Sequence, residues 1–192
     1  RTEYDVETKR FVWKTGDEVA VWAKSPDGSY ALDNQAFRLM AVASDKSEAY
    51  FTATLQSPMA EGTYSYYMTY PLPESMGGMT ATFTVPSVQD GTASDGVDII
   101  VAEPISGPAL EPVKEAAPIV SDDVLNVRMR HLLHFLRFYI PEGHNVLGEP
   151  VKRIEVTMPQ AVAGKVSVDV TDASTVSFGE GVNGLTLELR NP

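Results

Sequence analysis

The sequence lacks cysteine entirely and has only three histidines among its 192 residues. Without cysteine, neither a disulfide framework nor a thiolate zinc site can form. Basic residues are also scarce, because 15 Lys and Arg stand against 26 Asp and Glu and give a formal net charge of −11. A charge of this sign repels the phosphate backbone of nucleic acids. We therefore expect no nucleic-acid partner.

Long hydrophobic runs are absent as well, since no window reaches the ~18 apolar residues that a membrane-spanning helix requires. The chain begins at Arg1 and has no apolar segment typical of a signal peptide, so we expect any targeting peptide to have been removed. A chain of this length buries enough surface to fold without a metal or disulfide. The length therefore favours one sizeable domain over residues 1–192, and we expect no cofactor.

Short stretches of alternating, β-branched and aromatic residues recur between Gly, Pro, Asp and Ser, which is typical of an all-β sandwich. We predict strands near 8–13, 18–24, 48–55, 63–70, 80–85, 97–102, 151–158, 165–170 and 184–189. The proline-rich segment 102–123 interrupts this pattern, because proline cannot donate to a strand ladder. We interpret 102–123 as a long connection within one sandwich.

The stretch "VRMRHLLHFLRFYI" at 127–140 combines arginines and histidines with the largest cluster of bulky apolar residues. As a helix it would be amphipathic, and as strands it would change phase within 132–135. We predict a strand, then one short helical turn or bulge near 130–135, then a second strand. Pro141 would end the element.

Two metal sites are conceivable from the sequence. His131 and His134 lie one helical turn apart, with His144 further on, but no zinc-protease motif frames them. The loop at 89–98 carries three aspartates that could wrap calcium, but their spacing does not match a calcium-binding loop and two Asp-Gly turns explain it more economically. We therefore expect no metal.

Other functional patterns are equally weak. Arg128, Arg130 and Arg137 could face lipid headgroups from a basic amphipathic helix, although the surrounding chain is acidic. The sequence contains no nucleophile elbow and no phosphate-binding glycine loop, and it singles out no pair of catalytic carboxylates. We expect a protein that is not an enzyme and has no catalytic residue.

An aromatic strand offers one candidate ligand site. Tyr64, Tyr66 and Tyr70 share one face of the predicted strand at 63–70, and a row of rings could stack on a sugar. Such alternation more often marks a core face. Both interpretations remain open at this point.

Five stretches occur in the order and rough spacing of one family. They are "FVWKTGDEVAVW" at 11–22, "YYMTYP" at 66–71, "FTVPSVQDG" at 83–91, "GVDIIVAEP" at 96–104 and the stretch at 127–140. The chain thereby resembles the fimbrillin-like family, which comprises type V pilins, tip and anchor subunits and related surface lipoproteins of Bacteroidetes. The resemblance spans nearly the whole chain, and its strongest elements are Trp13 with Gly16-Asp17 and the V-x-M-x-H-L-L pattern at 127–133.

The resemblance implies the amino-terminal domain of such a protein. Its fold would be a transthyretin-like β-sandwich of about seven to nine mostly antiparallel strands, with a second sandwich expected after residue 192. The location would be the outer-membrane surface or a pilus, with membrane attachment only through a lipid anchor outside this chain. The family also implies a structural core formed by Trp13, Met129, Leu132, Leu133, Phe135, Leu136, Phe138 and Ile140.

In pilins of this group a protease removes an amino-terminal strand after an arginine, and a strand of a neighbouring subunit replaces it. Lys9-Arg10 and Arg1 are candidate cleavage positions, although ordinary surface basic residues explain them as well. The resemblance thus implies a pilus or adhesin subunit that assembles with other pilus subunits by donor-strand exchange and mediates attachment. The alternative is a glycan- or protein-binding module of a surface lipoprotein that does not polymerise, with a host or bacterial surface partner.

Overall fold

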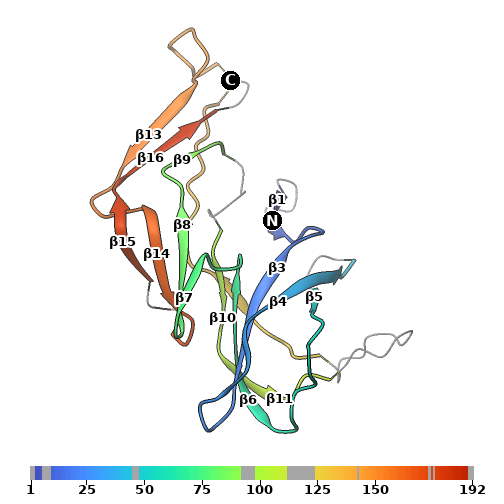
Figure 1. Ribbon diagram of the computed structural model, residues 1–192. Coiled ribbons are helices and arrows are strands. Elements are labelled where there is room, and N and C mark those ends of the chain that lie inside the picture. Colours follow the sequence, from blue (N-terminus) through green and yellow to red (C-terminus); the bar gives the residue numbers. More distant parts are fainter. Residues whose placement is uncertain are drawn as a thin grey trace.

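The computed structural model describes residues 3–5, 10–44, 48–91, 98–111, 124–141, 143–172, 174 and 176–189. Within these ranges the chain contains strands and connecting loops and no helix (Figure 1). The predicted all-β sandwich is confirmed. All strand pairs are antiparallel except one, the parallel pair β9 and β16.

The largest sheet has seven strands in the order β12-β10-β6-β3-β4-β5, with β11 also paired to β6. Its members are β3 (Glu18–Lys24), β4 (Tyr30–Val42), β5 (Ala49–Thr52), β6 (Thr63–Tyr70), β10 (Ile100–Ala102), β11 (Ile105–Pro108) and β12 (Met129–His131). The sequence of β3, EVAVWAK, has apolar residues at five consecutive positions, as expected of a strand covered on both faces.

Three smaller sheets complete the fold. A four-stranded sheet has the order β15-β14-β8-β7, a three-stranded sheet has the order β13-β16-β9, and β1 pairs with β2 alone. Their bounds are β1 (Glu3–Asp5), β2 (Arg10–Val12), β7 (Ser75–Gly77), β8 (Thr80–Val85), β9 (Val88–Gln89), β13 (Arg153–Thr157), β14 (Ala163–Asp169), β15 (Val176–Val182) and β16 (Gly184–Glu188).

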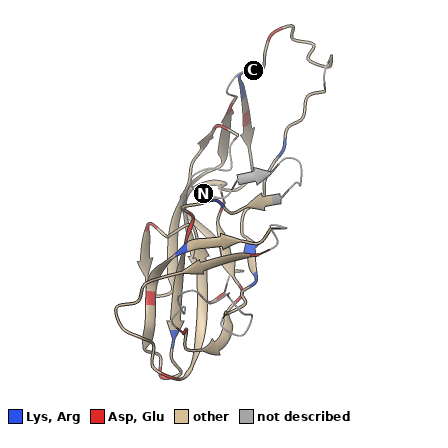
Figure 2. Cartoon of the chain, turned by 90° about the vertical axis from the view of Figure 1, so that its right-hand side faces the viewer, with Lys and Arg blue, Asp and Glu red and all other residues tan. Residues whose placement is uncertain are grey.

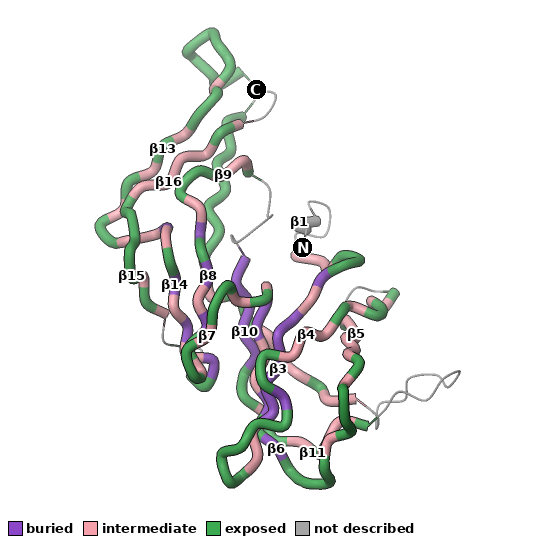
Figure 3. Tube along the Cα trace, viewed as in Figure 1, coloured by how far each residue is buried: buried purple, intermediate pink, exposed green. Residues whose placement is uncertain are grey.

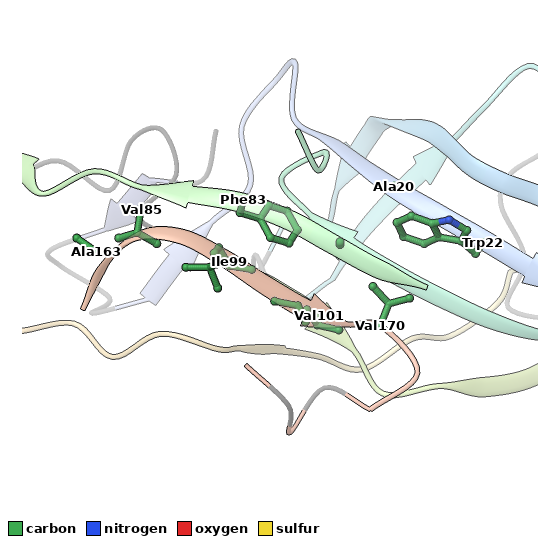
Figure 4. Close-up of a cluster of buried hydrophobic side chains, with 11 residues drawn as sticks. Ala20, Trp22, Phe83, Val85, Ile99, Val101, Ala163 and Val170 are labelled. Carbon is green, nitrogen blue, oxygen red and sulfur yellow. The ribbon is translucent and has the colours of Figure 1, made fainter. Parts of the chain in front are cut away.

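One core cluster joins the seven-stranded sheet to the four-stranded sheet (Figure 4). Its buried members come mainly from β3, β8, β10 and β14. They are Ala20, Trp22, Ala81, Phe83, Val85, Ile99, Val101, Ala163, Val166, Val168 and Val170. Figure 3 shows that buried residues concentrate on these strands, whereas β13 and the loop before it are exposed or half-buried.

A second cluster occupies the opposite face of the seven-stranded sheet. Val19, Val21 and Ala23 of β3 point to this face, because side chains alternate along a strand. Loops and β11 cover it with half-buried residues such as Leu55, Ile105 and Leu125. The seven-stranded sheet is therefore buried on both faces at its centre.

The sequence underestimated the number of strands. β4, at 13 residues the longest strand, falls where no strand was predicted, because its sequence YALDNQAFRLMAV lacks steady alternation. The proline-rich connection also contains β11, whose Pro108 occupies the end of the strand, where a missing N–H does little harm. The rest of that connection, 112–123, lies outside the described residues.

The stretch at 127–140 differs from its predicted form. β12 covers Met129–His131, the chain bends at Leu132 and Leu133, and 134–140 then runs without secondary structure. A bend replaces the helical turn, and the second strand is absent. Hydrogen bonding to β10 ends at Leu132 N, which donates to Ile99 O at 2.8 Å.

Candidate functional site

A tight turn fixes the start of the seven-stranded sheet. The backbone N–H of Asp17 donates to Lys14 O at 2.9 Å, and the Asp17 carboxylate accepts from Lys14 N at 2.7 Å. Gly16 adopts a φ of 92°, in the region that glycine tolerates without strain. The Gly16-Asp17 pair thus closes the turn that leads from Trp13 into β3.

The turn places Trp13 among aromatic rings at one end of the sheet. Its ring meets Phe51 edge-on at 5.0 Å and Tyr70 edge-on at 4.9 Å between centroids, which are favourable geometries for aromatic pairs. The Tyr70 hydroxyl donates to the buried Asp17 carboxylate at 3.2 Å. Trp13 is half-buried and packs against the second cluster.

The amino-terminal strand β2 lies beside a second group of rings. The ring of Phe11 lies 4.6 Å from that of Phe135 and 5.0 Å from the imidazole of His131. In the described part of the chain, the ladder of β2 joins β1 and none of the larger sheets. The ring of Phe11 therefore joins this strand to β12 and to the segment that follows it.

Segment 134–140, which we call the exposed apolar segment, continues from this contact. Its large apolar side chains are between 44% and 75% exposed and comprise Phe135, Leu136, Phe138, Tyr139 and Ile140. The core assignment of Phe135, Leu136, Phe138 and Ile140 is therefore wrong for this structure. The chain leaves the sheet at the bend after β12, so no described strand pairs with these residues and neither core cluster includes them.

The other predicted core residues of this stretch lie inward. Met129 is half-buried and packs against the second cluster, whereas Leu132 and Leu133 are half-buried and pack against the first. The bend therefore separates an inward-facing part of the stretch from an outward-facing part. A contiguous exposed apolar surface of this kind commonly marks an interaction site.

The proposed sugar platform is not available. Tyr64, Tyr66 and Tyr70 are buried in the second cluster. The Tyr66 hydroxyl donates to Pro108 O at the end of β11, and the Tyr64 hydroxyl donates to Ala60 O at 2.8 Å. Burial is the main cause that raises the pKa of Tyr66 to about 12. Because β11 and the loops cover this face, the three rings form core and cannot stack on a ligand.

The histidines and aspartates do not gather into a metal site among the described residues. Instead, Nδ1 of His131 lies 2.6 Å from Oδ1 of the buried Asp98. The hydrogen bond to Asp98 raises the pKa of His131 above its ordinary value, against the opposing effect of burial. Asp90 is half-buried at the other end of the predicted calcium loop, and Asp95 lies outside the described residues.

The remaining predicted residues are the candidate cleavage positions and the arginines of the stretch at 127–140. Arg10 begins β2, whereas Arg1 and Lys9 lie outside the described residues. The structure leaves three arginines of the stretch exposed, Arg128, Arg130 and Arg137. Separately, no helix in the described ranges is long and apolar enough to cross a membrane. Figure 2 shows charged residues scattered over strands and loops in that view.

Sequence reasoning missed Phe11 and the outward face of 134–140. The signal was present, because "FLRFYI" does not alternate as a half-buried strand would and is followed by proline. A run of this kind fits a fully buried strand as well as an exposed segment without secondary structure. The sequence alone therefore did not distinguish these two structures.

Comparisons with known proteins place this fold. No protein-family model and no curated protein matches the chain. A solved structure similar to it is that of a "putative cell adhesion protein" from Bacteroides uniformis ATCC 8492, with a TM-score of 0.56 and 15% sequence identity. The likeness covers 94% of this chain and 66% of that chain, so this chain spans just under two thirds of the length of its structural neighbour. At this identity, the likeness shows a shared fold.

Proposed function

We propose that this protein is a non-enzymatic subunit of a cell-surface pilus or a related adhesin. The observation that carries the proposal is the exposed apolar segment, which contacts the amino-terminal strand β2 through Phe135 and Phe11. The sequence resemblance to fimbrillin-like proteins and the fold shared with a Bacteroides protein described as a cell adhesion protein support the same role.

Assembly would proceed by donor-strand exchange. Departure of the β1–β2 hairpin would take Phe11 from Phe135 and lengthen the uncovered surface toward His131. An extended strand of a neighbouring subunit could then add to β12, which ends the order of the seven-stranded sheet, and bury alternate side chains, as in other cases of strand addition. The partners would be other pilus subunits, and attachment would follow through a surface protein or glycan.

The location that follows from this proposal is the bacterial cell surface. Any membrane attachment would come from a lipid anchor outside this chain, because 134–140 is short and interrupted by Arg137. Catalysis plays no part in this role, which depends on strand edges and apolar contacts.

The proposal is tested by cutting the amino-terminal strand. The full-length protein is digested briefly with an arginine-specific protease and is examined by size-exclusion chromatography and negative-stain electron microscopy before and after cleavage. Filaments or ladders that form only after cleavage are expected.

A matched control separates this cut from others. Arg10→Lys keeps the charge but removes the cleavage position in β2, so this variant should stay monomeric under the same digestion. Arg38→Lys changes an exposed arginine of β4 instead and should behave as wild type. A cleaved protein that remains monomeric would contradict donor-strand assembly. That result would favour a binding module that does not polymerise, and a glycan screen would follow.

A further inference from the structure

The imidazole of His131 lies where three parts of the chain meet. Its Nδ1 is 2.6 Å from the carboxylate of Asp98, which is buried just before β10. Its ring lies 5.0 Å from Phe11 of β2 and 6.1 Å from Phe135 of the exposed apolar segment. One titratable side chain therefore contacts the amino-terminal strand, the central sheet and the proposed assembly surface.

We propose that His131 acts as a proton-operated latch, which holds β2 against the sandwich when it is protonated and loosens β2 when it is neutral. The latch would regulate the surface described above, so its importance for assembly rests on the proposed function. The existence of the latch does not depend on that function, because the attachment of β2 can be measured in a monomer.

The charges around the imidazole define the direction of the effect. From the approach to β10 it is faced by Asp98, whereas Phe11 of β2 and Phe135 after β12 are uncharged. On its own strand, the neighbouring Arg130 points to the other face, because side chains alternate. Protonation gives the imidazole a positive charge, which strengthens its bond to the Asp98 carboxylate and attracts the π-face of a nearby ring.

The pH dependence follows by linkage. The hydrogen bond with Asp98, assisted by its charge and opposed by burial, raises the pKa of His131 in the folded protein. A raised pKa means that the stabilisation is fully present below the unfolded-state value of about 6.5 and is lost as the pH rises through the folded-state pKa. That stabilisation belongs to the folded protein as a whole, because Asp98 lies before β10 and not on β2. The part that acts on β2 is the attraction between the protonated imidazole and the Phe11 ring at 5.0 Å, so the latch is closed below the folded-state pKa of His131 and open above it.

Linkage also supplies a reciprocal test. If protonation of His131 tightens β2, then the presence of β2 must favour the protonated form by the same free energy. Phe11→Ala, which removes the ring that contacts the imidazole, should therefore lower the pKa of His131 measured by NMR titration. The chain has only three histidines, so the His131 signal can be assigned by its absence from the spectrum of His131→Gln.

Hydrogen exchange of the intact chain gives an independent readout. After correction for the intrinsic rate, the amides of 10–12 should lose protection severalfold from pH 6 to pH 8.5 in the wild type. They should be weakly protected at both pH values in His131→Gln, and His144→Gln should follow the wild type. An unchanged His131 pKa in Phe11→Ala, or equal protection in wild type and His131→Gln, would overturn the latch. Neither the NMR titration nor hydrogen exchange measures filament formation. The latch can therefore be confirmed or overturned whether or not the protein assembles into filaments.

Discussion

The hydroxyl of Tyr70 and the carboxylate of Asp17 form a hydrogen bond of 3.2 Å between residues 53 positions apart in the chain. The same carboxylate accepts the backbone N–H of Lys14, so a single buried side chain fixes both the turn before β3 and the end of β6. Polar groups at such depth are stable only when they are bonded.

Removal of this carboxylate should be costly. We expect Asp17→Ala to lower the free energy of unfolding by roughly 1–3 kcal/mol, because it leaves a buried hydroxyl and a backbone N–H without this acceptor. Tyr70→Phe should cost less, about 0.5–1.5 kcal/mol, since Asp17 keeps Lys14 N. Urea denaturation of both variants and of the double variant measures the coupling. Additive effects would contradict a direct interaction.

The bend after β12 predicts opposite outcomes for two neighbouring substitutions. Leu133 packs against the first cluster, so Leu133→Asp should destabilise the fold by several kcal/mol, about the cost of burying an unpaired charge. Leu136 is exposed, so Leu136→Asp should melt near the wild-type temperature. Differential scanning calorimetry compares them. Equal loss of stability in both would place Leu136 in the core after all.

Leu136→Asp has a second use. A charge on the exposed apolar segment should weaken strand docking while leaving the monomer folded, so this variant should form few filaments after protease cleavage. Normal filament yield from a folded Leu136→Asp protein would move the assembly surface elsewhere.

Two glycines with positive φ should respond differently to alanine. A Cβ at Gly164 would overlap the carbonyl oxygen of Glu180 at the irregularity in the β14–β15 pairing, whereas a Cβ at Gly16 meets nothing within 4 Å. We expect Gly16→Ala to cost about 1–2 kcal/mol from backbone strain alone and Gly164→Ala to cost more. Thermal denaturation ranks them, and the reverse order would contradict the described register.

The buried hydroxyl of Thr69 should be dispensable for stability. The indole Nε1 of Trp22 and the hydroxyl of Thr69 have no hydrogen-bond partner among the described residues. Thr69→Val keeps the side-chain shape and removes an unsatisfied group, so it should leave stability unchanged or raise it by about 1 kcal/mol. A clear loss of stability in chemical denaturation would mean that the hydroxyl is satisfied in solution.

The sequence predicted the elements whose apolar pattern is strong. EVAVWAK in β3 and TYSYYMTY in β6 were identified with their bounds, because continuous or alternating apolar residues report burial directly. β4 was missed, since it lies toward the edge of the sheet and most of its residues are exposed or half-buried, which weakens the periodic signal.

The candidate site was less predictable. The pairing of His131 with Asp98 joins positions 33 apart, and nothing local to either residue indicates it. The inward and outward parts of 127–140 both combine basic and bulky apolar residues, and a bend at Leu132 and Leu133 separates them. The tyrosine row was correctly placed on one face, but which face was covered depended on β11.

The alternation of β3 has a final consequence for how the molecule comes apart. Ala20 and Trp22 belong to one cluster while Val19 and Val21 belong to the other, so neither cluster can melt without disturbing this strand. The two clusters should therefore unfold in a single transition, and the amides of β3 should exchange only when both open.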